Sequence, residues 1–352
     1  EEQNKQLLQK VKEAGSCLND PNGKELQSKV HGPEDSQETV FEEVKSLLTS
    51  LLDGYNVCIM AYGQTGSGKT HTMIGSQSLE AKLGILQESQ EGIIPRASAE
   101  LFRLISKKPA ESHTVEVSVM EVYNNEVYDL LARDEQGRVD VTFKDKFKLP
   151  ALCSIYRPVN NASEIMQILG GVLKRRVKCP TLIHADSSRS HLVVSLTVST
   201  KSPNALALGE KQTCTVLQKV LAHFSHIWET PLVNEQTKLQ LVDLAGSECV
   251  GMTGVSGAAL WEVSCINRSL SALSDVLGAL AEQRPHVPYR NSKLTHLLQD
   301  AIGGDAKLLV MLCVSPTQCF VTESLQSLAF GTRVRQVQKE RPQRRTNTLK
   351  MK

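Results

Sequence analysis

A glycine-rich segment with the spacing of a phosphate-binding loop follows a short apolar run. Residues 63–70 read Gly-Gln-Thr-Gly-Ser-Gly-Lys-Thr, and the apolar residues 57–62 before them predict a buried strand. In such a loop, consecutive backbone N–H groups and the N-terminus of the following helix point at a polyphosphate. Lys69 can reach the β- and γ-phosphates, and the Thr70 hydroxyl can complete the ligand shell of a Mg²⁺ ion. The sequence therefore predicts a nucleoside triphosphate site, since a chance Gly/Ser loop would not follow such a strand.

Two further segments carry groups that could act on a bound triphosphate. Residues 186–191 read Asp-Ser-Ser-Arg-Ser-His and precede a strand-like run, and residues 243–248 read Asp-Leu-Ala-Gly-Ser-Glu at the end of another. Phosphoryl transfer needs in-line positioning, charge neutralisation and an oriented water more than covalent help from the protein. A carboxylate near Mg²⁺, a glycine N–H at the γ-phosphate and Ser, Arg and Glu side chains around the water would supply these.

The apolar patterns predict the elements that must position these groups. Periodicity predicts helices over residues 36–52, 258–282, 291–302 and 322–335, the third with a C-cap at Gly303 and Gly304. Strands are predicted over residues 57–62, 191–200, 239–244 and 307–314, and residues 114–131 predict a strand, a turn at Asn124 and Asn125, and a short helical run. Strands that alternate with helices indicate an α/β fold whose sheet is covered on both faces.

The chain is expected to form one domain with two tails. The domain spans residues 32–335, an N-terminal helical fragment and linker spans 1–31, and a basic C-terminal tail spans 336–352. Near the start, a fragment of heptad pattern is formed by Leu7, Val11, Ala14 and Leu18. That fragment leaves a homodimer through a coiled coil open, because it is too short to be stable alone. Within the long connection 200–238, only residues 216–227 favour a helix.

Composition excludes several classes of protein. The chain has 352 residues, a net charge of +2 and 40% hydrophobic residues, which is enough for a sizeable core. No stretch approaches the ~18 apolar residues of a membrane helix, and the charged N-terminus lacks the apolar core of a signal peptide. The nine cysteines contain no Cys-x-x-Cys pair, which argues for reduced thiols in the cytosol or nucleus and against a zinc site or disulfides. The basic tail favours an acidic partner surface or nucleic acid, with a merely solvated terminus as the alternative.

The three motifs, taken in order, resemble the phosphate loop, switch I and switch II of the kinesin motor domain. Further stretches that fit the same family are residues 51–73, 121–131, 266–280 and 286–300, so the resemblance covers roughly residues 32–335. It implies a P-loop NTPase fold of the kinesin motor type, with a central mixed, mostly parallel sheet. It also implies ATP and Mg²⁺ as the bound groups and the hydrolysis of ATP as the reaction.

The resemblance also assigns the nucleotide contacts. Lys69 and Thr70 would hold the phosphates and Mg²⁺, while Ser188 and Asp243 would contact the Mg²⁺ shell through its waters. His71 would stack on the adenine. The nucleotide-binding residues implied in this way are Gly63, Gln64, Thr65, Gly66, Ser67, Gly68, Lys69, Thr70 and His71.

Four switch residues receive roles in hydrolysis from the same resemblance. Ser187 and Glu248 would relay a proton from the attacking water, and Gly246 would sense the γ-phosphate. Arg189 and Glu248 would pair when the switches close around that water. The alternative for Glu248, an ordinary exposed acid after a turn, is weaker because the whole motif surrounds it.

In this family the helix after switch II and the elements that follow it bind microtubules. That implicates Arg268, His286, Tyr289, Arg290 and Lys293. Tubulin is strongly acidic, so binding through the cations on this face should weaken as salt rises, although Arg290 and Lys293 could also be generic surface charges. The implied partner is the microtubule, with no membrane and no specific nucleic acid, and the implied location is the cytoplasm and its cytoskeleton, including the spindle or centrosome.

Four departures from the kinesin pattern separate two functional hypotheses. Residues 1–40 lack the R-x-R-P strand that packs on the adenine, and His184 replaces the usual Asn. The loop 249–257 carries no basic residue and is followed by Leu260 and Trp261, and the connection 200–238 is lengthened. These departures favour a nucleotide-binding microtubule tether with weak ATPase activity, whereas the intact motifs favour an ATP-driven motor. The heptad fragment before the motor resembles the layout of C-terminal-motor kinesins, which move toward minus ends.

Overall fold

A seven-stranded mixed sheet forms the centre of the computed structural model, which describes residues 29–32, 34–76, 90–110, 112–132, 155–178, 189–201, 235–248, 257–303 and 306–337. The strand order is β3-β2-β5-β6-β1-β7, with β4 beside β2. The strands are β1 (Val57–Tyr62), β2 (His113–Tyr123), β3 (Glu126–Asp129), β4 (Arg157–Val159), β5 (His191–Thr200), β6 (Glu235–Asp243) and β7 (Lys307–Leu312).

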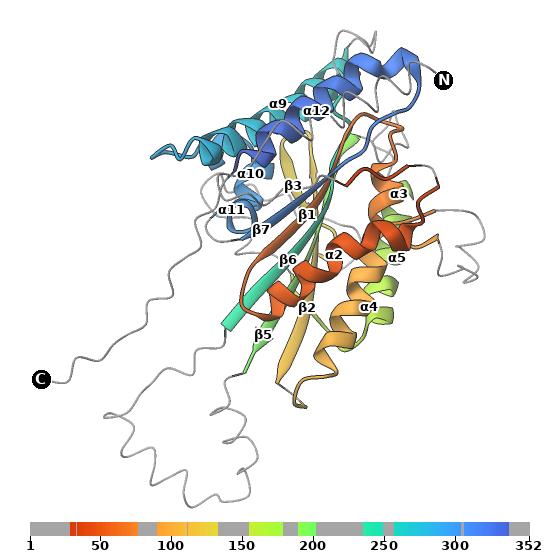
Figure 1. Cartoon of the computed structure of the whole chain (residues 1–352), viewed down its shortest axis with the longest axis vertical. Helices are drawn as coiled ribbons and strands as arrows, with labels where there is room; N and C mark the ends of the chain where they lie inside the picture. Colours follow the sequence, from red (N-terminus) through yellow and green to blue (C-terminus); the bar gives the residue numbers. More distant parts are fainter. Residues whose placement is uncertain are drawn as a thin grey trace, which may run out of the picture.

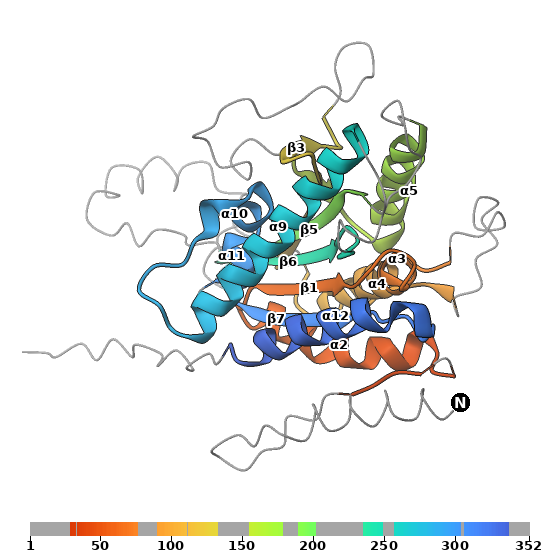
Figure 2. The same ribbon diagram turned by 90° about the horizontal axis from the view of Figure 1, so that it is seen from above.

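Helices cover both faces of this sheet (Figures 1 and 2). One face carries α2 (Gln37–Leu52), α3 (Lys69–Met73), α4 (Ile93–Ile105) and α5 (Ala162–Lys178), and the other α9 (Ala258–Ala281), α10 (Lys293–Leu297), α11 (Gln299–Ile302) and α12 (Val321–Arg335). Two short 3₁₀ turns, η5 (Tyr289–Asn291) and η6 (Gln318–Phe320), precede α10 and α12. Alternate strand residues such as Ile59 and Met60 enter the two separate apolar clusters, as the two-residue repeat of a strand requires. The expected α/β fold is confirmed.

The parallel part of the sheet is confined to β6, β1 and β7. β1 pairs in parallel with both neighbours, whereas the other described pairs are antiparallel. Parallel strands have their carboxyl ends at one edge, and the register places Ala61 opposite Asp243. The phosphate loop after β1 and the acidic motif after β6 therefore emerge side by side, at the kind of edge where open α/β sheets bind ligands.

The β2–β3 hairpin corrects one sequence prediction. Residues 126–129 form a strand, whereas a short helical run was expected there. Asn124 and Asn125 both have positive φ, at 49° and 62°, and they connect Tyr123 to its partner Glu126 as a two-residue turn. Two left-handed residues in a row twist the chain back along itself, and asparagine tolerates this conformation better than most residues. The turn was predicted, but the structure that follows it was not.

The expected helix over residues 291–302 is also wrong in detail. The segment divides into η5, α10 and α11, because Leu298 at ψ 1° interrupts the helical path. Ser292 begins α10 with a capping box, in which its side chain accepts from Thr295 N and the Thr295 hydroxyl faces Ser292 N. Gly303 is extended, with φ −95° and ψ 179°, so it does not form the left-handed C-cap that was expected.

The other strands and helices compare simply with their predictions. The helices predicted over 36–52, 258–282 and 322–335 and the strands over 57–62, 191–200, 239–244 and 307–314 are present within a few residues of their expected bounds. The helices α4 and α5 and the short strand β4 were not anticipated. The heptad fragment, His184, the helix over 216–227, residues 249–256 and the tail beyond 337 lie outside the described residues. Among the described helices none is long and apolar enough to cross a membrane.

Candidate nucleotide-binding and switch site

Contacts at Tyr62 and Gly63 fix the point at which the phosphate loop leaves β1. Tyr62, the last residue of β1, stacks on Phe330 of α12 with ring centroids 3.9 Å apart. Gly63 then passes so close to β7 that a Cβ there would lie 2.0 Å from the Cys313 carbonyl oxygen. Gly68 has φ 98° and is the N-cap of α3, which begins at Lys69 as predicted. The loop is thus anchored at the strand and aimed into the start of a helix.

Lys69 lies buried inside the loop that it serves. Its side chain is 6% exposed, and its ammonium donates to the Gln64 carbonyl oxygen at 2.6 Å. Ser67 Oγ donates to the same carbonyl at 2.8 Å. Burial lowers the pKa of Lys69, and the nearby Asp243 and Glu248 carboxylates oppose that shift. A buried ammonium with only one carbonyl partner is suited to an anionic ligand, because a phosphate would supply the charge that burial removes.

The groups suited to Mg²⁺ meet across two segments. Thr70 Oγ1 donates to Asp243 Oδ2 at 2.7 Å, which joins the start of α3 to the end of β6. A hydroxyl and a carboxylate on one spot form the hard oxygen donor set that Mg²⁺ prefers beside a phosphate. The residues present therefore fit the ion, which would be held by Thr70 and, through water, by Asp243.

Glu248 reaches back to the phosphate loop. Its carboxylate accepts from Thr65 N at 2.9 Å and from Thr65 Oγ1 at 2.7 Å. Gly246 lies directly beneath this contact, since a Cβ there would be 2.1 Å from Glu248 Oε2 and 2.2 Å from Thr65 Oγ1. Asn267 of α9 donates to the Glu248 carbonyl oxygen at 3.2 Å. The segment 243–248 is thus held between the phosphate loop and α9.

Arg189 has a different partner from the one expected. Its guanidinium donates to Glu262 Oε2 of α9 at 2.6 Å, and the Tyr123 hydroxyl of β2 donates to the other oxygen of Glu262. Because Glu248 is engaged by Thr65, the expected pair between Arg189 and Glu248 is not formed in this structure. In this structure Arg189 is thus bound by Glu262 on α9, while the Glu248 carboxylate after β6 is bound by Thr65.

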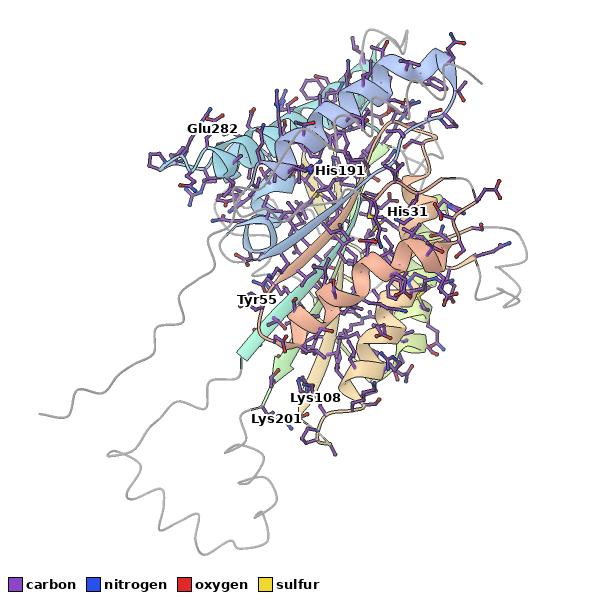
Figure 3. The ribbon with its side chains drawn as sticks, in the orientation of Figure 1. His31, Tyr55, Lys108, His191, Lys201 and Glu282 are labelled. Carbon is purple, nitrogen blue, oxygen red and sulfur yellow. The ribbon has the colours of Figure 1, made fainter. Side chains whose placement is uncertain are left out.

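A buried histidine, His191, connects β5, the segment after β6 and α9, and it is labelled in Figure 3. His191, at the start of β5, accepts from Ala245 N on Nδ1 at 3.0 Å. Its Nε2 must therefore carry the proton, and it donates to Ser269 Oγ at 2.6 Å. Ser269 Oγ in turn donates to the Ile266 carbonyl oxygen at 2.7 Å. This chain of hydrogen bonds connects the residue before Gly246 to the middle of α9.

The kinesin motor domain model matches residues 6–337 of the chain. The chain belongs to the kinesin family. By their sequences, the phosphate loop, residues 186–191 and residues 243–248 correspond to the P-loop, switch I and switch II of the kinesin pattern, and these names are used for them below. The helix α9 follows switch II.

Curated kinesins are similar to this chain over most of its length. The chain is 49% identical to Kinesin-like protein KIF25 of Macaca fascicularis, over 92% of the chain and 59% of the relative, and 48% identical to human KIF25, over 94% and 93%. It is also 38% identical to Kinesin-like protein KIN-14E of Oryza sativa, of which it spans 26%. The chain thus spans about three fifths of the macaque relative and a quarter of the plant one.

A solved kinesin structure shares the fold. The KIF14 dimer with AMP-PNP in complex with a microtubule is 32% identical, with a TM-score of 0.66 over 88% of this chain and 79% of the other. A structure described as a fast kinesin is 30% identical, with a TM-score of 0.67 over 93% of this chain and 86% of the other. Kinesin motor domains bind nucleotide, and the site geometry of this chain agrees with that property.

The structure brings most, but not all, of the predicted kinesin residues together. Lys69, Thr70, Asp243, Gly246 and Glu248 converge at one edge of the sheet. Ser187 and Ser188 lie outside the described residues. His71 is exposed, and Gln37 of α2 donates to its carbonyl oxygen at 2.9 Å. The microtubule candidates Arg268, His286 and Arg290 are exposed, whereas Tyr289 and Lys293 are half-buried.

Sequence reasoning missed the partners of the switches. His191 stood inside a recognised motif and Ser269 inside a recognised helix, but neither received a role. Glu262 and Tyr123 received none either. A buried acid next to a helix N-terminus is a weak signal in sequence, because its value depends on which distant cation meets it. The polar Ser269 within the apolar face of α9 is the signal that could have been used.

Proposed function

We propose that this chain is an ATP-driven microtubule motor that couples ATP hydrolysis to microtubule binding and movement. The observation that carries the proposal is the buried link from switch II to α9 through His191. A movement of Gly246 on loss of the γ-phosphate would displace Ala245, and the hydrogen bonds of His191 would transmit that displacement to α9, which carries Arg268. A pure nucleotide-binding domain has no need of such a link.

The hydrolytic site is proposed to work by positioning. Lys69 neutralises charge on the phosphates, and Thr70 and Asp243, with Ser188, would hold a Mg²⁺ ion that would add further charge neutralisation. Glu248, with Ser187, orients the attacking water and takes up its proton, which requires Glu248 to leave Thr65. Arg189 would then exchange Glu262 for Glu248 and close the site. The energy of this exchange is small, because one ion pair replaces another.

The microtubule face is proposed to consist of α9, η5 and α10. Its cations are Arg268 and Arg290, with Lys293 and His286 beside them. Such a face would bind acidic tubulin more weakly as salt rises. The heptad fragment before the motor favours movement toward the minus end, and the proposed location is the microtubule cytoskeleton, including the spindle or centrosome. The same fragment is the segment through which a homodimer, if one forms, is proposed to pair.

Steady-state ATPase assays with and without microtubules test this function. We expect microtubules to accelerate hydrolysis by the wild type, and Glu248→Ala to reduce the turnover number by ~10²–10⁴-fold, since it removes the group that orients the water. Nucleotide binding, measured with a fluorescent ATP analogue, should persist in this variant. Wild-type hydrolysis no faster than that of Glu248→Ala, together with intact microtubule binding, would instead favour the nucleotide-binding tether.

A further inference from the structure

Two large apolar side chains at the first turn of α9 face solvent. Leu260 is 40% exposed and Trp261 is 58% exposed, the highest value among the large apolar residues of the described part of the chain. The remaining apolar residues of α9, from Val263 to Leu277, are buried against the sheet. A single exposed leucine is ordinary on a protein surface. An exposed tryptophan beside it is less so, because tryptophan is the residue most enriched at the energetic centres of interfaces.

Trp261 belongs to one exposed stripe of α9. Trp261, Arg268, Asp275 and Glu282 follow each other at intervals of seven residues, and all four are exposed. Seven residues are nearly two helical turns, so Trp261 lies ~10.5 Å from Arg268 along the same side of the helix. Figure 3 labels Glu282, which marks the opposite end of this stripe. The stripe is therefore apolar at its start, basic in its middle and acidic toward its end.

The first turn of α9 is held in place from the side opposite to solvent. Glu262, the next residue, accepts from Arg189 and from Tyr123, and these two come from separate elements of the core. A turn fixed in this way holds the backbone of Trp261 in place, which lowers the entropic cost of ordering this turn when a contact forms. The apolar side chains therefore lie on a fixed turn, on the same side of α9 as Arg268.

We propose that Leu260 and Trp261 form an apolar contact with the microtubule surface, beside the ionic contact of Arg268. This inference rests on the proposed microtubule binding and names a contact that the cations do not provide. The two kinds of contact differ physically. Attraction between charges is screened by salt, whereas burial of apolar surface is not weakened by it. The contact would therefore preserve binding at high salt concentrations, where ionic contacts are weakened. The loop 249–257 carries no basic residue and so adds no ionic contact of its own.

Co-sedimentation with microtubules over a series of salt concentrations tests the contact. We expect Trp261→Ala to weaken binding by ~5–30-fold at every salt concentration, as truncation of a central aromatic contact does. The slope of log Kd against log salt should stay that of the wild type. Arg268→Ala should instead reduce that slope. Phe320→Ala is the matched control, because Phe320 is 43% exposed on η6, outside the α9 stripe, and its truncation should change neither quantity.

Three results would overturn the inference. Wild-type affinity in both Trp261→Ala and Leu260→Ala would exclude the contact, and so would a loss of affinity that vanishes at high salt. A wild type that dimerises through this patch, seen as a monomeric Trp261→Ala with unchanged microtubule affinity, would assign the surface to a second copy of the chain. A wild type that does not bind microtubules at all overturns the proposed function itself. Thermal unfolding of each variant separates these outcomes from misfolding.

Discussion

The phosphate loop and the switch residues are held by contacts of opposite range. Lys69 and Ser67 both donate to the carbonyl of Gln64, within five residues of themselves. Glu248 reaches a residue 183 positions away, and His191 one 78 positions away. A lysine that is positioned by its own loop depends less on the arrangement of distant segments. Residues that depend on distant partners can report on the arrangement of those partners, which is what coupling requires.

The same difference separates two kinds of failure. Loss of a local contact in the phosphate loop should abolish binding of the nucleotide itself. Loss of a long-range contact should leave the nucleotide bound and change how α9 responds to it. Variants at Lys69, His191, Glu262 and Asn125, each with its own comparison variant and taken from the largest expected effect to the smallest, examine this division.

Lys69→Ala should have the largest effect. It removes the charge that the loop presents to the phosphates, so we expect ATP affinity to fall at least ~100-fold and nucleotide-dependent release from microtubules to disappear. The fold should survive, because burial already disfavours the Lys69 ammonium. Titration with a fluorescent ATP analogue measures the first effect and thermal unfolding the second.

Lys45→Ala is the control for Lys69→Ala. Lys45 is an exposed lysine on α2 that pairs with Glu42, and its loss should leave nucleotide affinity unchanged. If Lys69→Ala still released from microtubules normally with ATP, the phosphate loop would not be the switch, and the division between local and long-range contacts would fail at its first step.

The sequence predicted the local structure and the segments that converge on the site, but it missed several of their long-range partners. The strand, turn and helix around residues 63–70 were predictable because each is determined by neighbours in the chain. The turn at Asn124 was predicted correctly. The strand after it forms because it pairs with β2, and the local sequence pattern, which was interpreted as helical, contains no information about that pairing. Glu262 was missed because its partners Arg189 and Tyr123 come from other segments. Hydrophobic periodicity is a local signal and does not indicate which distant polar side chains will contact each other.

His191→Asn should uncouple the two regions. Asparagine retains an acceptor for Ala245 N but has no donor that reaches Ser269. ATP affinity should stay within ~3-fold of wild type, whereas the ratio of microtubule affinities with AMP-PNP and ADP should fall by ~5–10-fold, a coupling energy of the usual size. Loss of a buried hydrogen bond should also lower the free energy of unfolding by ~1–3 kcal/mol. Microtubule co-sedimentation in each nucleotide measures the ratio.

Ser269→Ala removes the same link from the α9 side. If the hydrogen bond carries the coupling, the double variant should be no worse than either single one, because both delete one interaction. Additive losses would mean that each residue acts through packing alone. An unchanged affinity ratio in His191→Asn would sink the coupling role of this histidine.

Glu262→Gln should have a smaller effect, and this effect should be a gain of basal ATPase activity rather than a loss of coupling. Glutamine keeps an acceptor for Tyr123 but loses the charge that holds Arg189 on α9. Arg189 would then move more readily to Glu248, so basal ATPase without microtubules should rise by ~2–5-fold, in keeping with the energy of a partly exposed ion pair. Tyr123→Phe removes only the neutral contact and should raise the rate less. A lower basal rate in Glu262→Gln would show that this pair supports the active arrangement rather than competing with it.

Asn125 tests a local determinant outside the site, where the smallest effect is expected. Its φ of 62° favours glycine, so Asn125→Gly should raise the free energy of unfolding by about 0.5 kcal/mol, and Asn125→Val should lower it by ~1–2 kcal/mol. Neither variant should change ATP affinity or the response to microtubules, since three strands separate β3 from β1, the strand that leads into the phosphate loop. Chemical denaturation of both variants measures the sign of the change in the free energy of unfolding.

If Asn125→Val altered the microtubule response without loss of fold, the β2–β3 hairpin would belong to the coupled region, because Tyr123 at its edge binds Glu262. The boundary between local and long-range control would then lie within β2.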